Sequence, residues 1–231
     1  MTASEAEKAL RDVGRIVAFV NRKEYCYACG DATKSYSARK LKHFTRQFVH
    51  LRPHTFVVFD RVVAGSASYP KTWLLHSIQE PVFPKQGPNF RIEHGGGRLD
   101  VWTLLPEDAV ATAVGGPGKE YWVDGKNYPP DQTRDPEAGA WRVEVKPTRD
   151  SASDLFLHVL VASDAHGGEG LPQVKLGSVD NETATVEIAD RAGKATLQFR
   201  TQAQTGGHVT IVQNRRTIVD EPLPAEIVLP R

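Results

Sequence analysis

The sequence lacks the segments that would place it in a membrane or mark it for export. None of its 231 residues lies in an apolar run that approaches the ~18 residues of a membrane-spanning helix. Residues 1–14, MTASEAEKALRDVG, are polar and contain no apolar core of a signal peptide. The 2 cysteines do not indicate a compartment. We therefore expect no membrane contact, and the cellular location stays open.

A strong net charge is also absent. The chain has 29 Lys and Arg against 28 Asp and Glu, a formal net charge of +1. Any attraction to an anion must therefore come from a local patch and not from a global field. Since the basic excess typical of nucleic-acid-binding domains is missing, we expect no nucleic-acid partner.

Common catalytic and metal-binding motifs are missing as well. There is no G-x-S-x-G, no phosphate-binding P-loop, no Rossmann fingerprint and no H-E-x-x-H. Two of the 8 histidines, His50 and His54, are four residues apart, but Pro53 lies between them. Carboxylates such as Glu80 and Glu93 are scattered, with no spacing that pairs two for glycoside hydrolysis. Spacing alone predicts neither a catalytic site nor a metal site.

The sequence is rich in turn residues and in short alternating runs. It has 19 Gly and 15 Pro but 1 Met, which suits a turn-rich β protein. We predict strands at Arg15–Asn21, Glu24–Cys29, Lys40–Leu51, Thr55–Ala64, Lys71–Gln79, Asn89–His94, Arg98–Leu105, Ala109–Val114, Glu120–Val123, Trp141–Lys146, Leu155–Ser163, Gln173–Val179, Thr183–Ala189, Ala195–Thr201, His208–Gln213, Thr217–Val219 and Glu226–Leu229.

This pattern predicts an all-β fold, a large antiparallel β-sandwich. We place it in one domain at residues 15–231, with a two-domain division as the alternative, since such sandwiches often exceed 200 residues. Residues 1–14 are an N-terminal extension in which residues 2–12 favour a short helix. The segment 124–140 is rich in Pro, Asp and Gly and is predicted to be a long surface loop, functional or mobile.

Cys26 and Cys29 form a C-x-x-C pair, which can be a redox motif or half of a zinc site. The segment alternates like a strand, and residues three apart on a strand point to opposite faces. No second cysteine pair completes a Cys₄ zinc site. We interpret the two residues as packed free thiols.

The run from Arg39 to Arg52 is strongly basic. At period two, one face carries two phenylalanines and the basic candidates for substrate binding: Lys40, Lys42, Arg46, His50 and Arg52. Such a face suits a polyanion. It also suits a solvated edge strand guarded by positive charge, and the sequence does not decide between the two.

Aromatic residues gather around the long loop. Trp122 precedes it and Tyr128 lies within it, and both are candidate substrate contacts because flat rings beside polar groups suit sugar faces. The alternative is ordinary packing at the core and rim of a sandwich.

Several motifs in order resemble the heparinase II/III-like polysaccharide lyases, with the nearer likeness to heparinase II. They are GRIVAF, YACGDATKSYS, RQFVHL, FVVFDRV, KTWLLHS, GGPGKEYWVDGKNY and EAGAWRVEVKP. The resemblance is to the C-terminal β-sandwich of that family and extends from about Asp12 to the C-terminus, more loosely after Ala165.

This resemblance implies a part in the degradation of acidic polysaccharides, such as heparin, heparan sulfate or other uronate chains, by β-elimination. In the family an N-terminal α/α toroid supplies catalytic Tyr and His residues, and a His-x-His segment at the start of the sandwich supplies another His and most ligands of a structural metal. Neither part is present in this sequence, so no catalytic residue is carried over. Full-length members are typically secreted or periplasmic.

The implied metal is zinc, and Asn21 stands at one ligand position. Because Asn is a poor substitute for imidazole on zinc, we expect no cofactor. The expected partners are an acidic polysaccharide and the missing toroid, and the chain alone is expected to be inactive. A non-catalytic carbohydrate-binding module and a structural scaffold that docks a partner are the alternatives.

Overall fold

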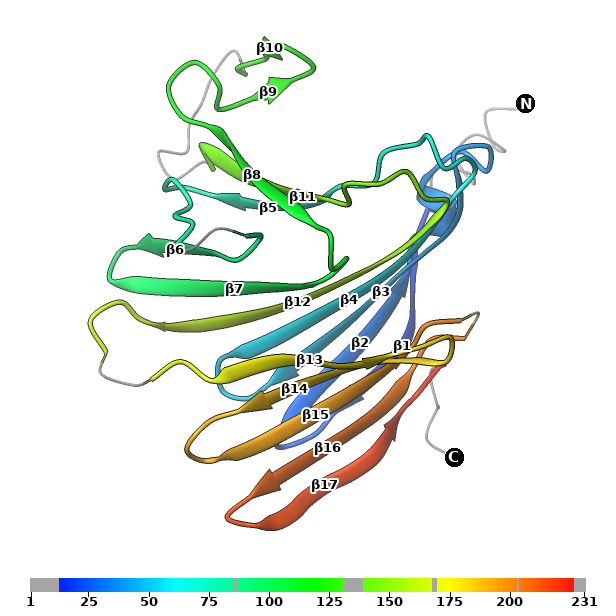
Figure 1. The fold of residues 1–231 in the computed structure, drawn as a ribbon, viewed down its shortest axis with the longest axis vertical. Coiled ribbons are helices and arrows are strands. Elements are labelled where there is room, and N and C mark those ends of the chain that lie inside the picture. The colour runs from blue at the N-terminus through cyan, green and yellow to red at the C-terminus, as the bar shows by residue number, and fades with distance from the viewer. Residues whose placement is uncertain (1–12, 85–86, 131–138, 168–169, 203, 227–231) are drawn as a thin grey trace.

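The computed structural model describes residues 13–84, 87–130, 139–167, 170–202 and 204–226. These described residues form a short 3₁₀ turn at Thr33–Ser35 and seventeen strands (Figure 1). The strands are β1 Arg15–Asn21, β2 Tyr25–Asp31, β3 Leu41–Leu51, β4 Thr55–Ala64, β5 Trp73–Ser77, β6 Phe90–His94, β7 Gly97–Leu105, β8 Val110–Gly115, β9 Trp122–Val123, β10 Lys126–Asn127, β11 Trp141–Lys146, β12 Ser153–Asp164, β13 Gln173–Val179, β14 Thr183–Ala189, β15 Gly193–Arg200, β16 Gly207–Gln213 and β17 Arg216–Leu223.

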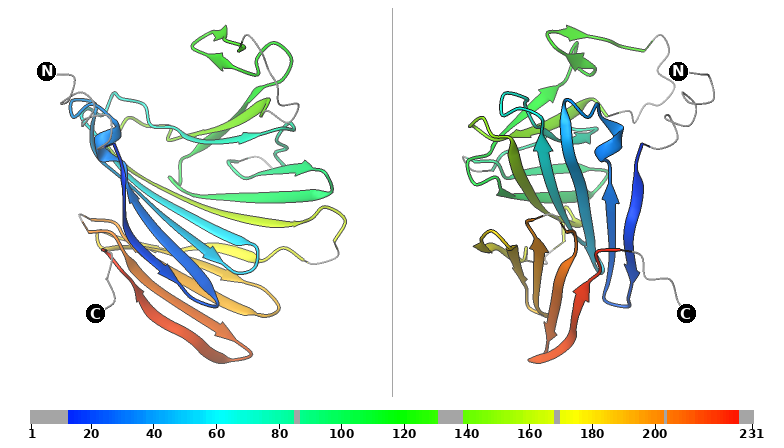
Figure 2. Two further views of the ribbon diagram at one scale, coloured as in Figure 1. Left: turned by 180° about the vertical axis from the view of Figure 1, so that it is seen from behind. Right: turned by 90° about the vertical axis from the view of Figure 1, so that its right-hand side faces the viewer.

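A seven-stranded sheet, ordered β1-β2-β3-β4-β12-β7-β6, is the middle layer of the molecule. A five-stranded sheet, β13 to β17 in sequence order, covers one of its faces, and a three-stranded sheet, β5-β11-β8, covers part of the other (Figures 1 and 2). The small β9–β10 hairpin lies beyond the three-stranded sheet (Figure 1). The described strand pairs are antiparallel throughout.

The main core lies between the seven-stranded and five-stranded sheets. Strict alternation on β2 sends Tyr25, Tyr27 and Cys29 into it. Phe59 of β4 stacks on Phe199 of β15 with ring centroids 4.9 Å apart, which ties the two sheets together. Such a buried aromatic pair contributes roughly 0.5–1.5 kcal/mol beyond the area it removes from water.

A second core lies under the three-stranded sheet. It joins residues of β4, β12, β7 and β6 to Trp73 on β5 and to Val143 and Val145 on β11. β12 is therefore buried on both faces, which explains its nearly continuous apolar sequence. No buried residue of β1, β2 or β3 among those described belongs to this second core, so the three-stranded sheet leaves these strands uncovered on that side.

The predicted all-β sandwich is confirmed, and most predicted strands lie within one to three residues of the observed bounds. The sequence missed β10, which lies inside the predicted loop at 124–140, and the 3₁₀ turn. The helix predicted at 2–12 lies outside the described residues, as do most of the last predicted strand and residues 131–138 of the loop. No helix among the described residues is long and apolar enough to cross a membrane.

Candidate functional site

The uncovered side of β1–β3, together with the adjoining part of β4, forms what we call the open face. Ile16 and Phe19 of β1 are 57% and 54% exposed there, and Phe48 of β3 is 37% exposed. The register places Phe19, Ala28 and Phe48 side by side across three strands. β2 contributes only small residues between them, so the large apolar side chains of β1 and β3 are exposed on the same face of the sheet.

An ion pair marks the border between the open face and the covered part of the sheet. Arg46 of β3 donates two hydrogen bonds to Asp60 of β4, Nε to Oδ1 at 2.7 Å and Nη2 to Oδ2 at 2.6 Å. The Asp60 side chain is 3% exposed and that of Arg46 is 47% exposed. The hydrogen bond to Asp60 raises the pKa of Arg46, while burial raises the pKa of Asp60 against the opposing effect of Arg46. The charge of Arg46 is therefore largely balanced by a carboxylate of the same sheet.

His50 lies on the open face in an aromatic setting. Its ring stacks on Phe56 with centroids 4.4 Å apart, and Phe48 packs against the same Phe56 ring at 5.8 Å. The Nε2 atom lies 3.0 Å from the carbonyl oxygen of Pro53, to which it can donate. Three aromatic rings thus form a half-exposed surface suited to the apolar face of a sugar or to another protein surface.

The basic face predicted from Lys40 to Arg52 is shorter in the structure, and only its middle part, from Phe44 to His50, keeps the period-two alternation. Lys40 lies in the turn before β3, and Lys42 lies at a register shift and donates to the carbonyl of Ala38 at 2.9 Å. Arg46 and His50 therefore share the open face, whereas Lys40 and Lys42 stand at one end of it.

Arg52 lies in the turn after β3. Its guanidinium donates to the carbonyl of Arg22 at 2.9 Å and to Oδ1 of Asn21 at 2.8 Å. These bonds hold the β3–β4 turn to the β1–β2 turn. The other three predicted basic contacts therefore do not lie with Arg46 and His50 on the open face. The register shift and the turns at the two ends of β3 displace them, and a regular alternation does not predict such irregularities.

Trp122 and Tyr128 lie together at the β9–β10 hairpin, far from β3 (Figures 1 and 2). Lys119 lies 5.5 Å from the Trp122 ring and Lys126 lies 4.9 Å from the Tyr128 ring, as in cation–π contacts. The structure therefore does not bring the aromatic candidates and the basic strand into one site.

The described residues do not fit the metal centre that the family resemblance implies. Asn21 offers a carboxamide oxygen, but this oxygen accepts a hydrogen bond from the cationic Arg52. On the neighbouring strands, Cys26 lies opposite Asn21 and His50 lies opposite Cys26. Among the described residues, no group of three His, Cys, Asp or Glu side chains is placed to hold a metal ion.

The two cysteines lie on opposite faces of β2, as the strand interpretation predicts. Cys29 is buried in the main core and Cys26 is half-buried on the open face; both are free. Burial raises the pKa of the Cys29 thiol. The pair has neither the helical placement of a redox motif nor convergent sulfur atoms.

Sequence reasoning missed three buried polar groups under the three-stranded sheet. Asp60 pairs with Arg46, Asp154 lies 3.1 Å from the ammonium of Lys71, and His158 is fully buried against Trp73. The available signal for Asp60 and His158 was one or two polar residues inside an apolar run, as in FVVFDRVV and LFLHVLVA. Buried charges of this kind need a partner. Arg46 comes from β3, the strand before β4, whereas Lys71 is distant in sequence from Asp154.

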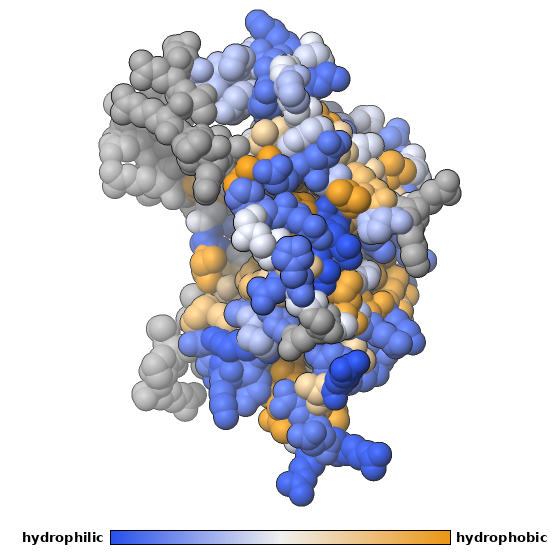
Figure 3. Space-filling model, turned by 90° about the vertical axis from the view of Figure 1, so that its left-hand side faces the viewer, coloured by the Kyte–Doolittle hydropathy of each residue, from blue (hydrophilic) through white to orange (hydrophobic). Residues whose placement is uncertain are grey.

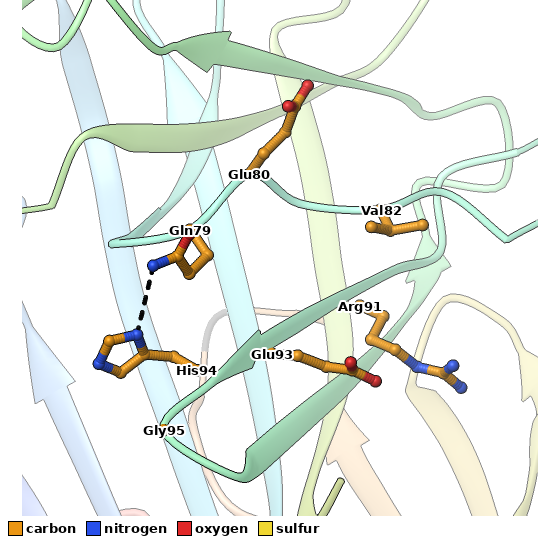
Figure 4. Close-up of a pocket in the computed structure, with 7 residues that line it drawn as sticks. All are labelled: Gln79, Glu80, Val82, Arg91, Glu93, His94 and Gly95. Atoms are coloured by element: carbon orange, nitrogen blue, oxygen red, sulfur yellow. Dashed lines mark hydrogen bonds between the residues drawn. The ribbon is translucent and has the colours of Figure 1, made fainter.

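A pocket of about 560 Å³ lies beside edge strand β6 (Figure 4). Gln79 donates to Nδ1 of His94 across it at 3.5 Å. Glu80 and Glu93, however, point in different directions, so their carboxylates do not converge (Figure 4). The pocket therefore does not supply the paired carboxylates of a glycoside hydrolase.

The sequence matches no protein-family model and no curated protein. Solved structures do resemble its fold. A heparan sulfate lyase from Pedobacter heparinus matches with a TM-score of 0.53 and 16% identity, over 92% of this chain and 28% of the lyase. Two structures of heparinase III match with TM-scores of 0.58 and 0.53 and identities of 11% and 13%, each over 81% of this chain and 27% of theirs.

At these identities the likeness concerns the fold. This chain spans little more than a quarter of the length of the structures it matches, 27% or 28%, and the rest of those proteins has no counterpart in it. The matched structures are a heparan sulfate lyase and heparinase III, so the nearer likeness to heparinase II stays a prediction. The described chain has the fold of a β-sheet region of heparinase-like polysaccharide lyases.

Proposed function

We propose that this chain is the β-sandwich part of a lyase that degrades an acidic polysaccharide, such as heparan sulfate or another uronate-containing chain, by β-elimination. The catalytic groups come from a further domain of the kind that the family resemblance implies, an α/α toroid. The open face is one wall of the substrate cleft and the docking surface for that domain.

The observation that carries this proposal is the shared fold, which covers 92% of this chain but 28% of a heparan sulfate lyase. The open face supports the second half of the proposal. Ile16 and Phe19 on β1 and Phe48 on β3 expose apolar surface on either side of the small residues of β2, and such exposure is typical of a surface that a partner covers. The rings of Phe48, His50 and Phe56 stand at its centre, where an aromatic surface suits a sugar ring.

Lyase activity is measured by the ultraviolet absorbance of the unsaturated uronate product, with heparin, heparan sulfate and alginate as substrates. We expect no turnover from the chain alone and turnover from the protein encoded by the complete gene, including any sequence upstream of Met1. Turnover by the isolated chain would contradict the assignment of the catalytic groups to another domain. An inactive complete protein on every acidic polysaccharide would contradict the lyase function itself.

The role of the open face is tested in the complete protein with Phe48→Asp, which places a charge on the proposed docking surface. Ile218→Asp is the matched control, because Ile218 is 42% exposed on β17 of the other sheet. We expect Phe48→Asp to lower turnover at least tenfold while the control keeps it. Equal turnover in the two variants would remove the open face from the cleft.

A second candidate function is a non-catalytic carbohydrate-binding module, and the exposed cations at the start of β3, Lys40 and Lys42, favour it. It predicts that the chain alone is retained on a heparin column and that retention falls steeply with salt, because counterions compete for the anionic polymer. Lys40→Glu with Lys42→Glu should abolish retention. Retention without lyase activity of the complete protein would favour this function over the first.

A further inference from the structure

A cleft of about 660 Å³ opens at one end of the sandwich, between the seven-stranded and five-stranded sheets. The β1–β2 and β3–β4 turns form one wall, and the β14–β15 turn with part of β16 forms the other. These turns lie together on the left-hand side of the molecule in Figure 1, the side that Figure 3 shows as largely hydrophilic with apolar areas between. The cleft and the open face lie on opposite sides of the seven-stranded sheet and meet at the β3–β4 turn, where Pro53 lines the cleft and can accept a hydrogen bond from His50.

Among the described residues around this cleft, basic side chains outnumber acidic ones. Lys23, Arg52, Arg191 and Lys194 line it, against Glu24 and Asp190. The Asp190 carboxylate accepts hydrogen bonds from two backbone N–H groups of its own turn, at 2.8 and 3.0 Å. The local charge is therefore positive in a chain whose net charge is close to zero.

Two of the cations are available to a ligand. Lys194 is paired with Glu187 at 2.6 Å, and Arg52 donates to the neighbouring turn. Lys23 and Arg191, by contrast, make no hydrogen bond or ion pair with any residue that the structure describes. They come from turns of the two different sheets, so a ligand in the cleft meets one positive group from each wall.

The floor of the cleft helps to identify the ligand. Leu51, Val161, Ile188 and Ile211 line it, but each is only 2–7% exposed. Of the other lining residues, Leu171 is 38% exposed, so an acyl chain would gain from that side chain but little from the floor, since the gain is proportional to the area buried. No Phe, Tyr or Trp is among the described lining residues, so a neutral sugar finds none of these rings to stack on; the aromatic ring there is the imidazole of His54. For an anion, the cleft offers the two cations and hydrogen bonds from groups such as Ser163 and Gln213.

We propose that this cleft binds a short stretch of an anionic saccharide, with Lys23 and Arg191 each holding a carboxylate or sulfate group. The volume is in the range of ordinary ligand sites, roughly 300–1,000 Å³. The proposal rests on the proposed function for its class of ligand, but the site is a second one, separate from the open face and without a part in bond cleavage. It would hold one part of the polymer to the protein while another part lies in the substrate cleft at the open face.

Two measurements on the chain test this proposal. In methyl-labelled protein, titration with an unsulfated oligouronate or a sulfated oligosaccharide should shift the methyl resonances of Ile188 and Ile211, which line the cleft, and not that of Ile16 on the open face. By calorimetry, Lys23→Gln with Arg191→Gln should weaken binding about tenfold, since two exposed charge contacts are lost. The control pair, Arg149→Gln with Lys175→Gln, likewise removes one exposed arginine and one exposed lysine, but outside the cleft, and should leave the affinity unchanged.

The outcomes separate this proposal from the lyase function. Shifts confined to Ile16 would overturn the cleft and leave the open face as the saccharide site. Equal weakening by both pairs of substitutions would show non-specific attraction and would also overturn it. Shifts at Ile188 and Ile211 with decanoate but not with the saccharides would overturn the class of ligand. The turnover of the complete protein decides the lyase function independently of all three.

Discussion

Acidification should destabilise this protein through His158. The imidazole is fully buried between β12 and β5, with its ring centroid 3.9 Å from that of Trp73. Thr103 Oγ1 donates to the carbonyl of Pro88, so Nδ1 of His158, 3.2 Å from the same oxygen, is the donor of the pair. Nε2 then has no hydrogen-bond partner among the described residues. A second proton would place an unpaired charge in an apolar layer.

Burial, with a smaller effect of the Arg46 charge, lowers the pKa of His158 from 6.5 to about 3. The unfolded chain binds a proton below pH 6.5, whereas the folded protein stays neutral down to about pH 3. The stabilising contribution is therefore present above pH 6.5 and is lost as the pH falls, by about 1.4 kcal/mol for each pH unit below 6.5. Between pH 7.5 and pH 5 the loss amounts to about 2 kcal/mol.

His158→Leu removes the titrating group and keeps an apolar side chain of similar size. The free energy of unfolding is measured by urea denaturation at several pH values, with Trp fluorescence as the signal. We expect the difference between wild type and variant to change by about 2 kcal/mol from pH 7.5 to pH 5, in favour of the variant at low pH. His94→Gln, at an exposed histidine, controls for the loss of one imidazole. Parallel pH curves for wild type and His158→Leu would refute the reasoning.

Three further predictions concern β2, β3 and β4. Arg46→Ala should cost roughly 2–4 kcal/mol of unfolding free energy because it leaves the buried Asp60 charge unpaired, and Asp60→Ala in the same chain should recover part of the loss in a double-mutant cycle. Phe48→Ser should change stability by less than about 1 kcal/mol, because its ring is partly exposed, and should reduce self-association at high concentration in light scattering. A thiol reagent should modify Cys26 in the native protein and Cys29 only after unfolding; two fast thiols would contradict the observed burial.

The order and type of the strands could be predicted because alternation and turn residues are local signals. β1, β4, β11, β13 and β14 have the predicted bounds. The pairing of β4 with β12 could not be predicted, since it joins residues about a hundred positions apart. That pairing decides the architecture. It inserts β12 between β4 and β7 in the seven-stranded sheet, and β12 then contributes to the second core.

The candidate site was predictable only in part, for the same reason. The face containing Arg46 and His50 follows from period two, but its length depends on a register shift at Lys42 that has no clear sequence signature. The neutralisation of Arg46 depends on Asp60 lying opposite it on the next strand. The cleft at the turns was missed entirely, since its two free cations, Lys23 and Arg191, are distant in sequence and meet only through the packing of two sheets.

The contrast between the open face and the cleft indicates that they serve different partners. β1 is an edge strand, yet it exposes Ile16 and Phe19 on the side that no sheet covers. An edge strand that exposes large apolar side chains favours aggregation unless something covers it, so a protein partner suits this face. The cleft offers two cations, Lys23 and Arg191, that are unpaired among the described residues, above a floor of nearly buried apolar side chains, which suits an anion. If both assignments hold, the sandwich both anchors a catalytic domain and retains its anionic substrate, on opposite sides of one sheet.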